Sequence, residues 1–248
     1  MQAYALTDIG KKRQMNQDCV FAATEPVGPF SDLFILADGM GGHRAGDTAS
    51  KYFIETFRSY VEKSLTKEPV TVFGQAVSYA NTLLYSKAQS QEELRGMGTT
   101  CVAATINDGC LTVANVGDSR LYVIRDGKID QITRDHSLVE ELVALGELRR
   151  DSEDYKKQKH IITKAVGIER EIRADYFDEM LSEGDYVLLC SDGLSNMVSD
   201  REILSIVKGT GNIKKKCEKL VDRANKNGGS DNIAVILIKV TEEGENHD

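Results

Sequence analysis

The hydrophobic and polar positions of this 248-residue chain follow two different periods, and each period predicts one kind of element. Short apolar runs bounded by glycine, aspartate or proline are typical of strands, and apolar residues repeated every three or four positions are typical of amphipathic helices. The run Leu33-Phe34-Ile35-Leu36-Ala37 predicts a strand buried on both faces. It ends at Asp38-Gly39 with further glycines beyond, so we expect a carboxylate held rigidly at an exposed strand end.

The remaining elements are predicted in the same way. Strands are expected at residues 3–8, 19–22, 99–106, 110–116, 121–125, 128–133, 186–190 and 233–238. Helices are expected at about 47–65, 69–84, 199–207 and 213–224, with capping boxes at Ser137/Glu140 and Ser199/Glu202. Because strands and helices are clustered rather than alternating, the pattern favours two antiparallel sheets between helical layers.

Composition limits the function classes. The length fits one domain, although length alone would also allow two. The net charge of −8, with no large basic patch, argues against nucleic-acid binding. The five cysteines are scattered and form no metal-ligand spacing, which indicates buried thiols in a reducing compartment. Since the sequence shows neither a signal peptide nor an apolar run of membrane-spanning length, we expect a cytoplasmic protein without membrane insertion.

Four aspartates share one setting. Asp38, Asp118 and Asp192 follow apolar strands and Asp231 precedes one, each with glycine close by. One Asp-Gly pair is an ordinary turn, and the pairs at 108–109 and 126–127 are interpreted in that way. Four such acids predict a carboxylate cluster that needs cations, because unpaired carboxylates repel one another. All-oxygen ligands favour magnesium, manganese or calcium over zinc.

Residues 134–163 form the least regular stretch of the chain. Its charged part admits two interpretations, a solvated loop or a mobile flap beside a functional site. Among the histidines, His136 is expected to tie a loop, and neither His160 nor His247 shows any functional signal.

Seven short motifs in order resemble the metal-dependent serine/threonine protein phosphatases of the type-2C class in their compact bacterial form. They are Arg13-x-x-Asn16-Gln17-Asp18, Asp38-Gly39-Met40-Gly41-Gly42-His43, Gly98-Thr99-Thr100, Val116-Gly117-Asp118-Ser119-Arg120, Asp135-His136-Ser137, Ser191-Asp192-Gly193-Leu194 and Gly229-Ser230-Asp231-Asn232. The resemblance covers about residues 2–240. It implies an α+β fold, a four-layer α-β-β-α sandwich of two mainly antiparallel sheets flanked by helix pairs. It also implies one catalytic domain at 1–241, a flap subdomain at about 144–162 and a polar tail at 242–248.

The resemblance further implies a binuclear manganese or magnesium centre. Asp38 would bridge both metals, and Asp192 and Asp231 would complete the first site. The Gly39 carbonyl would bind the second metal. Asp118 would share a weaker third metal with Asp192.

The same resemblance assigns roles in the reaction. Asp18 would hold metal-bound waters from the outer shell, and Arg13 would clamp the substrate phosphate. A metal-activated water would attack phosphorus in line, without a phosphoenzyme. Met40 stands where eukaryotic members carry a histidine that is a candidate general acid, so His43 is the remaining candidate in this loop.

We therefore expect an enzyme that hydrolyses phosphoserine and phosphothreonine in proteins and opposes a bacterial serine/threonine kinase. Its expected partners are phosphorylated proteins, including that kinase and its substrates, and the chain is expected to be a monomer. Two alternatives stay open: a metal phosphoesterase for small molecules, and an inactive scaffold that binds phosphoproteins. The complete set of acids argues against the scaffold.

Overall fold

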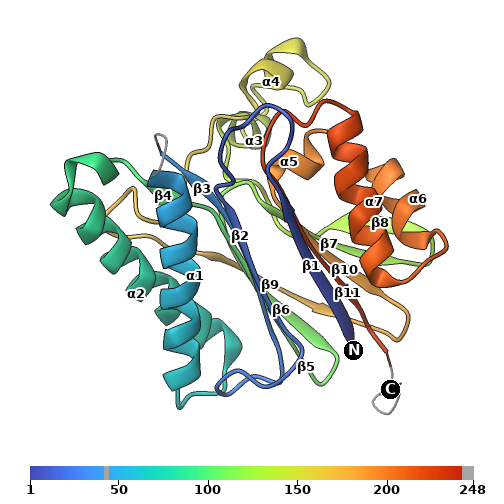
Figure 1. Ribbon diagram of the computed structural model, residues 1–248, viewed down its shortest axis with the longest axis horizontal. Helices are drawn as coiled ribbons and strands as arrows, with labels where there is room; N and C mark the ends of the chain where they lie inside the picture. Colours follow the sequence, from blue (N-terminus) through green and yellow to red (C-terminus); the bar gives the residue numbers. More distant parts are fainter. Residues whose placement is uncertain (42–44, 242–248) are drawn as a thin grey trace.

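Two antiparallel sheets lie face to face between two layers of helices in the computed structural model, which describes residues 1–41 and 45–241, with Lys156 described by its backbone alone (Figure 1). The first sheet contains, in spatial order, β1 (Gln2–Asp8), β11 (Ile233–Lys239), β10 (Tyr186–Cys190), β7 (Arg120–Arg125) and β8 (Lys128–Gln131). The second contains β2 (Asp18–Ala23), β3 (Leu33–Met40), β5 (Cys101–Asn107), β6 (Cys110–Val116) and β9 (Asp175–Met180), with β4 (Gly98–Thr99) paired to β3. The expected four-layer fold is confirmed.

The helices divide between the two outer layers and the flap. α1 (Ala45–Lys63) and α2 (Pro69–Ser90) cover the second sheet, followed by the short 3-10 helix η1 (Glu92–Leu94). α5 (Asp192–Ser195), α6 (Asp200–Lys208) and α7 (Ile213–Lys226) cover the first sheet. α3 (Leu138–Ala144) and α4 (Glu153–Gln158) project at one end of the sandwich (Figure 1). In the described residues, no helix combines the length and the apolar character that a membrane crossing requires.

Strand β3 explains why the sandwich has two apolar interfaces. Leu33, Ile35 and Ala37 pack into the core under α1 and α2, and Phe34 and Leu36 pack into the core between the sheets. Successive side chains of a strand point to opposite faces, so an unbroken apolar run fills both cores at once.

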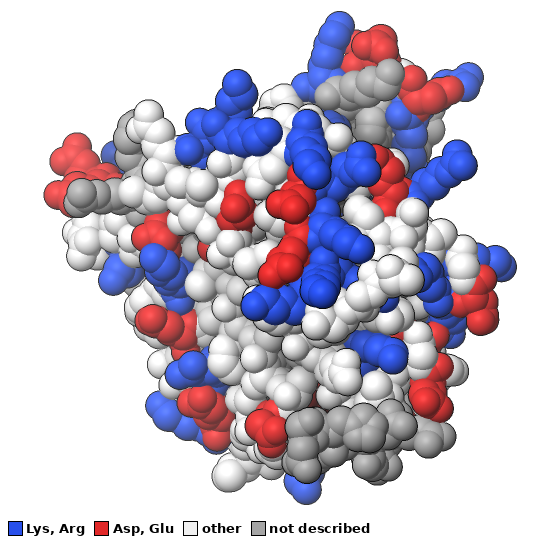
Figure 2. Space-filling view, turned by 45° about the vertical axis from the view of Figure 1, so that its right-hand side comes forward, with Lys and Arg blue, Asp and Glu red and all other residues white. Residues whose placement is uncertain are grey.

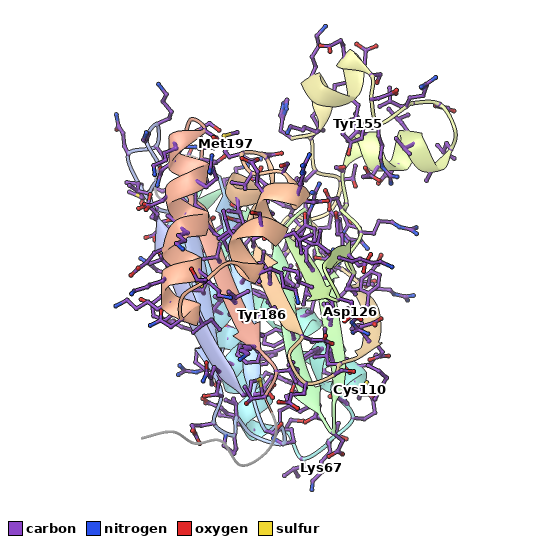
Figure 3. The ribbon with its side chains drawn as sticks, turned by 90° about the vertical axis from the view of Figure 1, so that its right-hand side faces the viewer. Lys67, Cys110, Asp126, Tyr155, Tyr186 and Met197 are labelled. Carbon is purple, nitrogen blue, oxygen red and sulfur yellow. The ribbon has the colours of Figure 1, made fainter. Side chains whose placement is uncertain are left out.

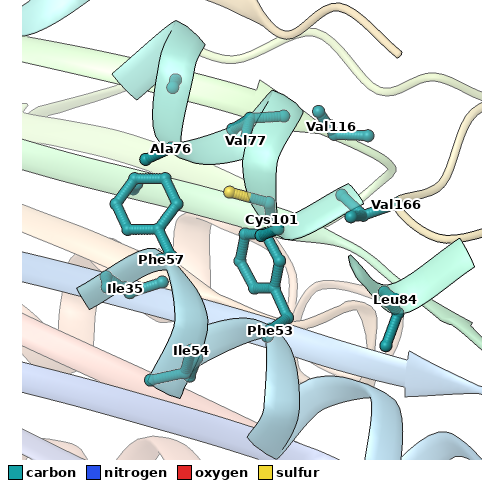
Figure 4. Packing of buried hydrophobic residues seen from close by; sticks show 14 of the residues in the cluster. Ile35, Phe53, Ile54, Phe57, Ala76, Val77, Leu84, Cys101, Val116 and Val166 are labelled. Atoms are coloured by element: carbon teal, nitrogen blue, oxygen red, sulfur yellow. The ribbon is translucent and has the colours of Figure 1, made fainter. Parts of the chain in front are cut away.

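Aromatic rings fill the core between the helix pair and the second sheet (Figure 4). The ring of Phe57 lies 5.6 Å from those of both Phe53 and Phe73, measured between centroids. Leu65 was expected to extend this apolar stripe, and that prediction is wrong: α1 ends at Lys63, and Leu65 is 99% exposed.

The local predictions had mixed outcomes. The turns at Asp108 and Asp126 are confirmed as hairpin turns, since both residues have the left-handed φ that such turns need. The capping box at Ser199/Glu202 is confirmed. At Ser137 only half of the box forms, because the Glu140 carboxylate binds Arg150 and Tyr155 instead.

Three features were not predicted. Strand β9 pairs with β6, and the irregular segment 134–163 contains a second helix, α4, in addition to the short helix α3 that the Ser137 cap predicted. Lys216 follows two exposed lysines, Lys214 and Lys215, but is itself buried. Its ammonium donates to the carbonyl of Val207 and the hydroxyl of Tyr186.

Candidate metal centre

Acidic residues from distant parts of the chain meet at the flap end of the sandwich. Asp18 and Asp38 are directly opposite one another on β2 and β3. Asp192 follows β10 and Asp231 precedes β11, and because these neighbouring strands are antiparallel, the end of one meets the start of the other. Asp118 lies between β6 and β7. The structure thus brings together all five predicted carboxylates.

A cavity of about 370 Å³ opens among these acids. Its wall consists of Arg13, Gln17, Asp38, Gly39, Met40, Gly41, Thr100, Asp118, His160, Ile162, Asp192, Asp231 and Asn232. A second cavity of about 120 Å³ lies beneath the flap and shares Asp118 and Asp192 with the first. The two acids predicted to hold a third metal therefore border both cavities.

Threonines fix the backbone of Asp38. The Asp38 amide donates to Thr100 Oγ1, and the Asp38 carbonyl accepts from the Thr100 amide and from Thr99 Oγ1, each at 2.9 Å. Thr100 Oγ1 also lies 2.8 Å from Ser119 Oγ, next to Asp118. The Gly-Thr-Thr motif thus holds the strand end that carries the acid, which is the preorganisation that a metal ligand needs.

Hydrogen bonds also cross between the two sheets at this end. Ser191 Oγ donates to Asp18 Oδ2 at 2.7 Å and accepts from the Ala234 amide at 2.9 Å. Asn196 Nδ2 donates to Asp192 Oδ2 at 2.9 Å. One oxygen of Asp18 and one of Asp192 are thereby satisfied by the protein. The other oxygens, Asp18 Oδ1 and Asp192 Oδ1, are buried and have no hydrogen-bond partner among the described residues.

Burial and mutual repulsion shift the titration of these acids. Burial and the neighbouring carboxylates raise the pKa of Asp18 to about 7, that of Asp118 to about 8 and that of Asp192 to about 6. The same two causes raise the pKa of Asp38 well above its ordinary value. Charged carboxylates crowded in this way require compensating positive charge.

The donor set fits hard divalent cations. It consists of carboxylate and carbonyl oxygens, including two buried oxygens without partners, which suits manganese or magnesium. Within the described residues, no three acidic side chains already stand in the geometry of a closed metal site. Asp231 Oδ2 instead accepts from Arg13 Nη2 at 2.8 Å, so closing the site requires side chains to turn toward the cation.

Other predicted site residues have different outcomes. Gly39 lies on β3, and a Cβ there would stand 2.0 Å from the carbonyl oxygen of Gly46, so only glycine lets α1 begin so close to the cavity. The proposed general acid His43 lies outside the described residues. His136 ties a loop as expected: its Nδ1 accepts from the Gly117 amide at 2.9 Å, and its Nε2 lies 3.1 Å from a carboxylate oxygen of Asp175.

Sequence reasoning missed two flap residues. His160 and Ile162 line the main cavity, although nothing in the surrounding polar sequence distinguished His160. The flap carrying them is held by Glu140, which accepts from the Arg150 guanidinium at 2.6 Å and from the Tyr155 hydroxyl at 2.6 Å. Figure 3 shows Tyr155 in the flap at the same end of the molecule as Met197, with Cys110 and Lys67 toward the opposite end.

The molecular surface carries both signs of charge. On the face shown in Figure 2, Lys and Arg side chains lie beside Asp and Glu side chains. This mixed surface is consistent with the net charge of −8 and differs from the uniform basic face of a nucleic-acid-binding protein.

Comparison with known proteins assigns the family. Residues 10–237 match the family model described as protein phosphatase 2C. The chain belongs to the protein phosphatase 2C family. Among curated members, protein phosphatase PhpP of Streptococcus pneumoniae serotype 2 is 40% identical over 246 residues, covering 98% of this chain and 99% of that protein. Serine/threonine phosphatase stp of Listeria welshimeri is 37% identical and covers 96% of each chain.

Solved protein phosphatase 2C structures agree with this fold. The serine/threonine phosphatase of S. agalactiae superposes with a TM-score of 0.90 at 37% identity, over 96% of this chain and 99% of that one. The catalytic domain of PstP in complex with two manganese ions gives a TM-score of 0.84 at 31% identity, over 97% of this chain and 98% of that one. This protein is therefore a metal-dependent serine/threonine protein phosphatase, which confirms the predicted enzyme class.

Proposed function

We propose that Asp38, Asp192 and Asp231, with the Gly39 carbonyl, hold a pair of divalent cations at the main cavity. The observation that carries this assignment is the convergence of carboxylates from four chain segments on one cavity, where the buried Oδ1 of Asp192 has no hydrogen-bond partner among the described residues. Manganese is the first candidate, since the PstP catalytic domain is described with two manganese ions, and magnesium suits the same oxygens.

Two further acids complete the proposed ligand set. Asp18 accepts from Ser191 through one oxygen, which leaves its other oxygen to hold a metal-bound water from the outer shell. Asp118 borders both cavities with Asp192, which supports the proposal that this pair binds a weaker third cation.

The chain's own groups then position the substrate. Bound divalent cations supply the activation of a water molecule and part of the charge neutralisation. Arg13 lies beside Asp231 in the cavity wall. Its planar guanidinium can bind two phosphate oxygens and stabilise the negative charge that develops on them during in-line displacement at phosphorus. The flap supplies His160 and Ile162 to the cavity wall, where they would contact the residues around the phosphorylated side chain.

The proposed substrates are proteins phosphorylated on serine or threonine. The proposed physiological role is to oppose a bacterial serine/threonine kinase by dephosphorylating the kinase and its substrates. The relatives named above as serine/threonine phosphatases support this role. We further propose one catalytic domain at 1–241 with a flap at about 144–162, acting as a monomer in the cytoplasm.

The decisive experiment is release of phosphate from a phosphothreonine peptide with manganese, with magnesium and with a chelator. We expect release only with a divalent cation, and much faster release from the peptide than from a nucleotide of equal concentration. Preference for the nucleotide would support the small-molecule phosphoesterase, and binding of the phosphopeptide without turnover would support the scaffold.

A further inference from the structure

One side chain holds both ends of the segment that carries Arg13. Asn232 Nδ2 donates to the carbonyl oxygens of Ile9 and Met15, each at 2.9 Å. Its Oδ1 accepts from the Gln17 amide, also at 2.9 Å. Asn232 is 3% exposed, so water does not compete for these bonds. The amide group of one residue thus closes the segment 9–17 into a loop with Arg13 inside it.

The same loop rests on the turn that carries Asp231. The Lys11 amide donates to the Gly229 carbonyl at 2.8 Å. Gly10 has φ +77°, and a Cβ at this position would lie 2.1 Å from the Asp231 carbonyl oxygen. The two backbones are therefore in direct contact, and only glycine fits between them.

Asn232 is also linked to the acid beside it. Its backbone amide donates to Asp231 Oδ1 at 2.8 Å, while Asp231 Oδ2 accepts from Arg13. One residue therefore orients a proposed metal ligand through its main chain and the loop of the proposed phosphate clamp through its side chain.

We propose that Asn232 is the positioning residue that sets where Arg13 stands relative to the metal centre. This inference rests on the proposed function of Arg13 and Asp231. The side chain of Asn232 acts on Arg13 through the loop: without its three bonds, segment 9–17 regains backbone freedom, and the guanidinium no longer lies where the phosphate arrives. Misplacing a binding group by about 1 Å can cost roughly a hundredfold in rate.

The geometry requires asparagine at this position. One short side chain must donate two N–H groups to backbone carbonyls and accept a hydrogen bond from a backbone amide. Leucine has a similar size and supplies none of them, and serine supplies at most part of the set. Asn232→Leu therefore removes the tether with little change in volume.

The chain contains a matched control in Asn81. It is 1% exposed, its Nδ2 donates to the carbonyls of Glu169 and Arg170 at 3.1 and 3.2 Å, and its Oδ1 accepts from the Gly167 amide at 2.7 Å. Asn81 thus makes the same three kinds of bond, but to a loop that does not carry Arg13. Asn81→Leu loses equivalent hydrogen bonds without touching the clamp.

The test is a double-mutant cycle with Arg13→Ala, measuring kcat and KM on a phosphothreonine peptide at saturating manganese. Asn232→Leu is expected to lower kcat/KM by about tenfold or more, divided between kcat and KM as in Arg13→Ala. In the Arg13→Ala background the same substitution should change kcat/KM by less than about threefold. Asn81→Leu should leave both constants within about twofold.

Hydrogen exchange of the metal-free protein gives a second readout. Asn232→Leu should speed exchange in residues 9–17, and Asn81→Leu should speed it in residues 165–171 instead. If Asn232→Leu does not fold, Asn232→Ser takes its place in both measurements.

Three outcomes would overturn the proposal. The first is an equal loss of kcat/KM on Asn232→Leu with and without Arg13. The second is a loss of kcat/KM in Asn81→Leu as large as that in Asn232→Leu. The third is unchanged hydrogen exchange in residues 9–17 of Asn232→Leu. A wild-type protein without manganese-dependent turnover would overturn the proposed function and this inference together. Wild-type turnover combined with one of the three outcomes would overturn the role of Asn232 alone.

Discussion

Strand β3 has an acid at each end, and the two acids differ in what surrounds them. Asp32 lies directly before the strand and is fully buried, and its Oδ1 accepts from the Ile106 amide at 2.8 Å. Asp38, near the other end, faces Asp18, Asp118 and other carboxylates instead. The neighbours of Asp32 are donors, so the protein satisfies this acid by itself. The neighbours of Asp38 are acids, so that end needs a cation from outside.

Burial raises the pKa of both carboxyls, to about 6 for Asp32 and well above the ordinary value for Asp38. A raised pKa therefore does not distinguish a metal ligand from a structural acid. The surrounding groups do: donors indicate a structural role, and converging acids with unpartnered oxygens indicate a metal site.

The sharpest test of this contrast is substitution at each end of β3. Asp38→Asn is expected to reduce manganese-dependent phosphatase activity by at least about 10³-fold, or about 4 kcal/mol, because it removes the bridging carboxylate. Asp32→Asn should keep activity within about twofold. Phosphate release is the measurement, with circular dichroism to show that both variants fold. Substantial activity in Asp38→Asn would contradict the assigned metal role.

A second test uses stability in place of turnover. Manganese at a hundredfold excess over its Kd should raise the free energy of unfolding by about 2.7 kcal/mol relative to chelator. Denaturant unfolding should show this difference in the wild type and in Asp32→Asn, and lose most of it in Asp231→Asn. Coincident curves for the wild type with manganese and with chelator would argue against cation binding at the acidic end.

The third test concerns the pH dependence of stability that Asp32, at the other end of β3, should cause. Because the pKa of Asp32 is raised to about 6 in the folded protein, the folded state binds this proton more tightly than the unfolded chain, whose pKa is about 4. Its contribution to stability is therefore full below about pH 4 and is lost as pH rises through about 6. Asp32→Asn should remove this decrease in the free energy of unfolding with rising pH, because asparagine does not titrate.

Between pH 4 and pH 8, the stability of Asp32→Asn relative to wild type should rise by on the order of 2 kcal/mol. Urea unfolding in chelator measures it, and Asp126→Asn, at an exposed turn, is the control. A stability difference between Asp32→Asn and wild type that does not vary with pH would show that Asp32 is not the group that titrates.

The smallest expected effect concerns the Arg13 guanidinium, which forms an ion pair with Asp231 at the acidic end. Arg13 holds Asp231 Oδ2, so Arg13→Ala should tighten manganese binding by about three- to tenfold. Lys12→Ala removes the same charge from an exposed neighbour and should change affinity less. Titration calorimetry measures both. Equal shifts would indicate general electrostatics instead of competition for Asp231.

Sequence patterns predicted the sandwich and its acidic residues because both depend on local signals. The apolar runs before Asp38 and Asp192 mark the strands that carry the ligands, and Asp-Gly chemistry marks the hairpin turns. Strand β9 was missed because it lies at a sheet edge and its polar residues, Asp175, Asp178 and Glu179, do not alternate with apolar ones, so the sequence lacks the period of two that marks a strand.

Contacts between distant residues could not be predicted in this way. The tether from Asn232 to Met15 spans 217 residues, and Asn232 is otherwise an ordinary turn residue. His160 reaches the cavity because the flap brings it there. Nothing in the short polar sequence around Asp32 indicates that this acid is buried. In each case, three-dimensional proximity decides the role, and the neighbouring sequence does not encode it.

The position of β11 has a consequence for biosynthesis. This strand lies between β1 and β10, yet among the described residues it is the last strand in chain order, and Asp231 lies two residues before it. A nascent chain lacking residues 231–239 therefore presents two unpaired strand edges, which favour aggregation or chaperone binding. It also lacks part of the proposed ligand set. Phosphatase activity should consequently appear only after translation has passed this strand, so no shorter translation product can act on phosphoproteins prematurely.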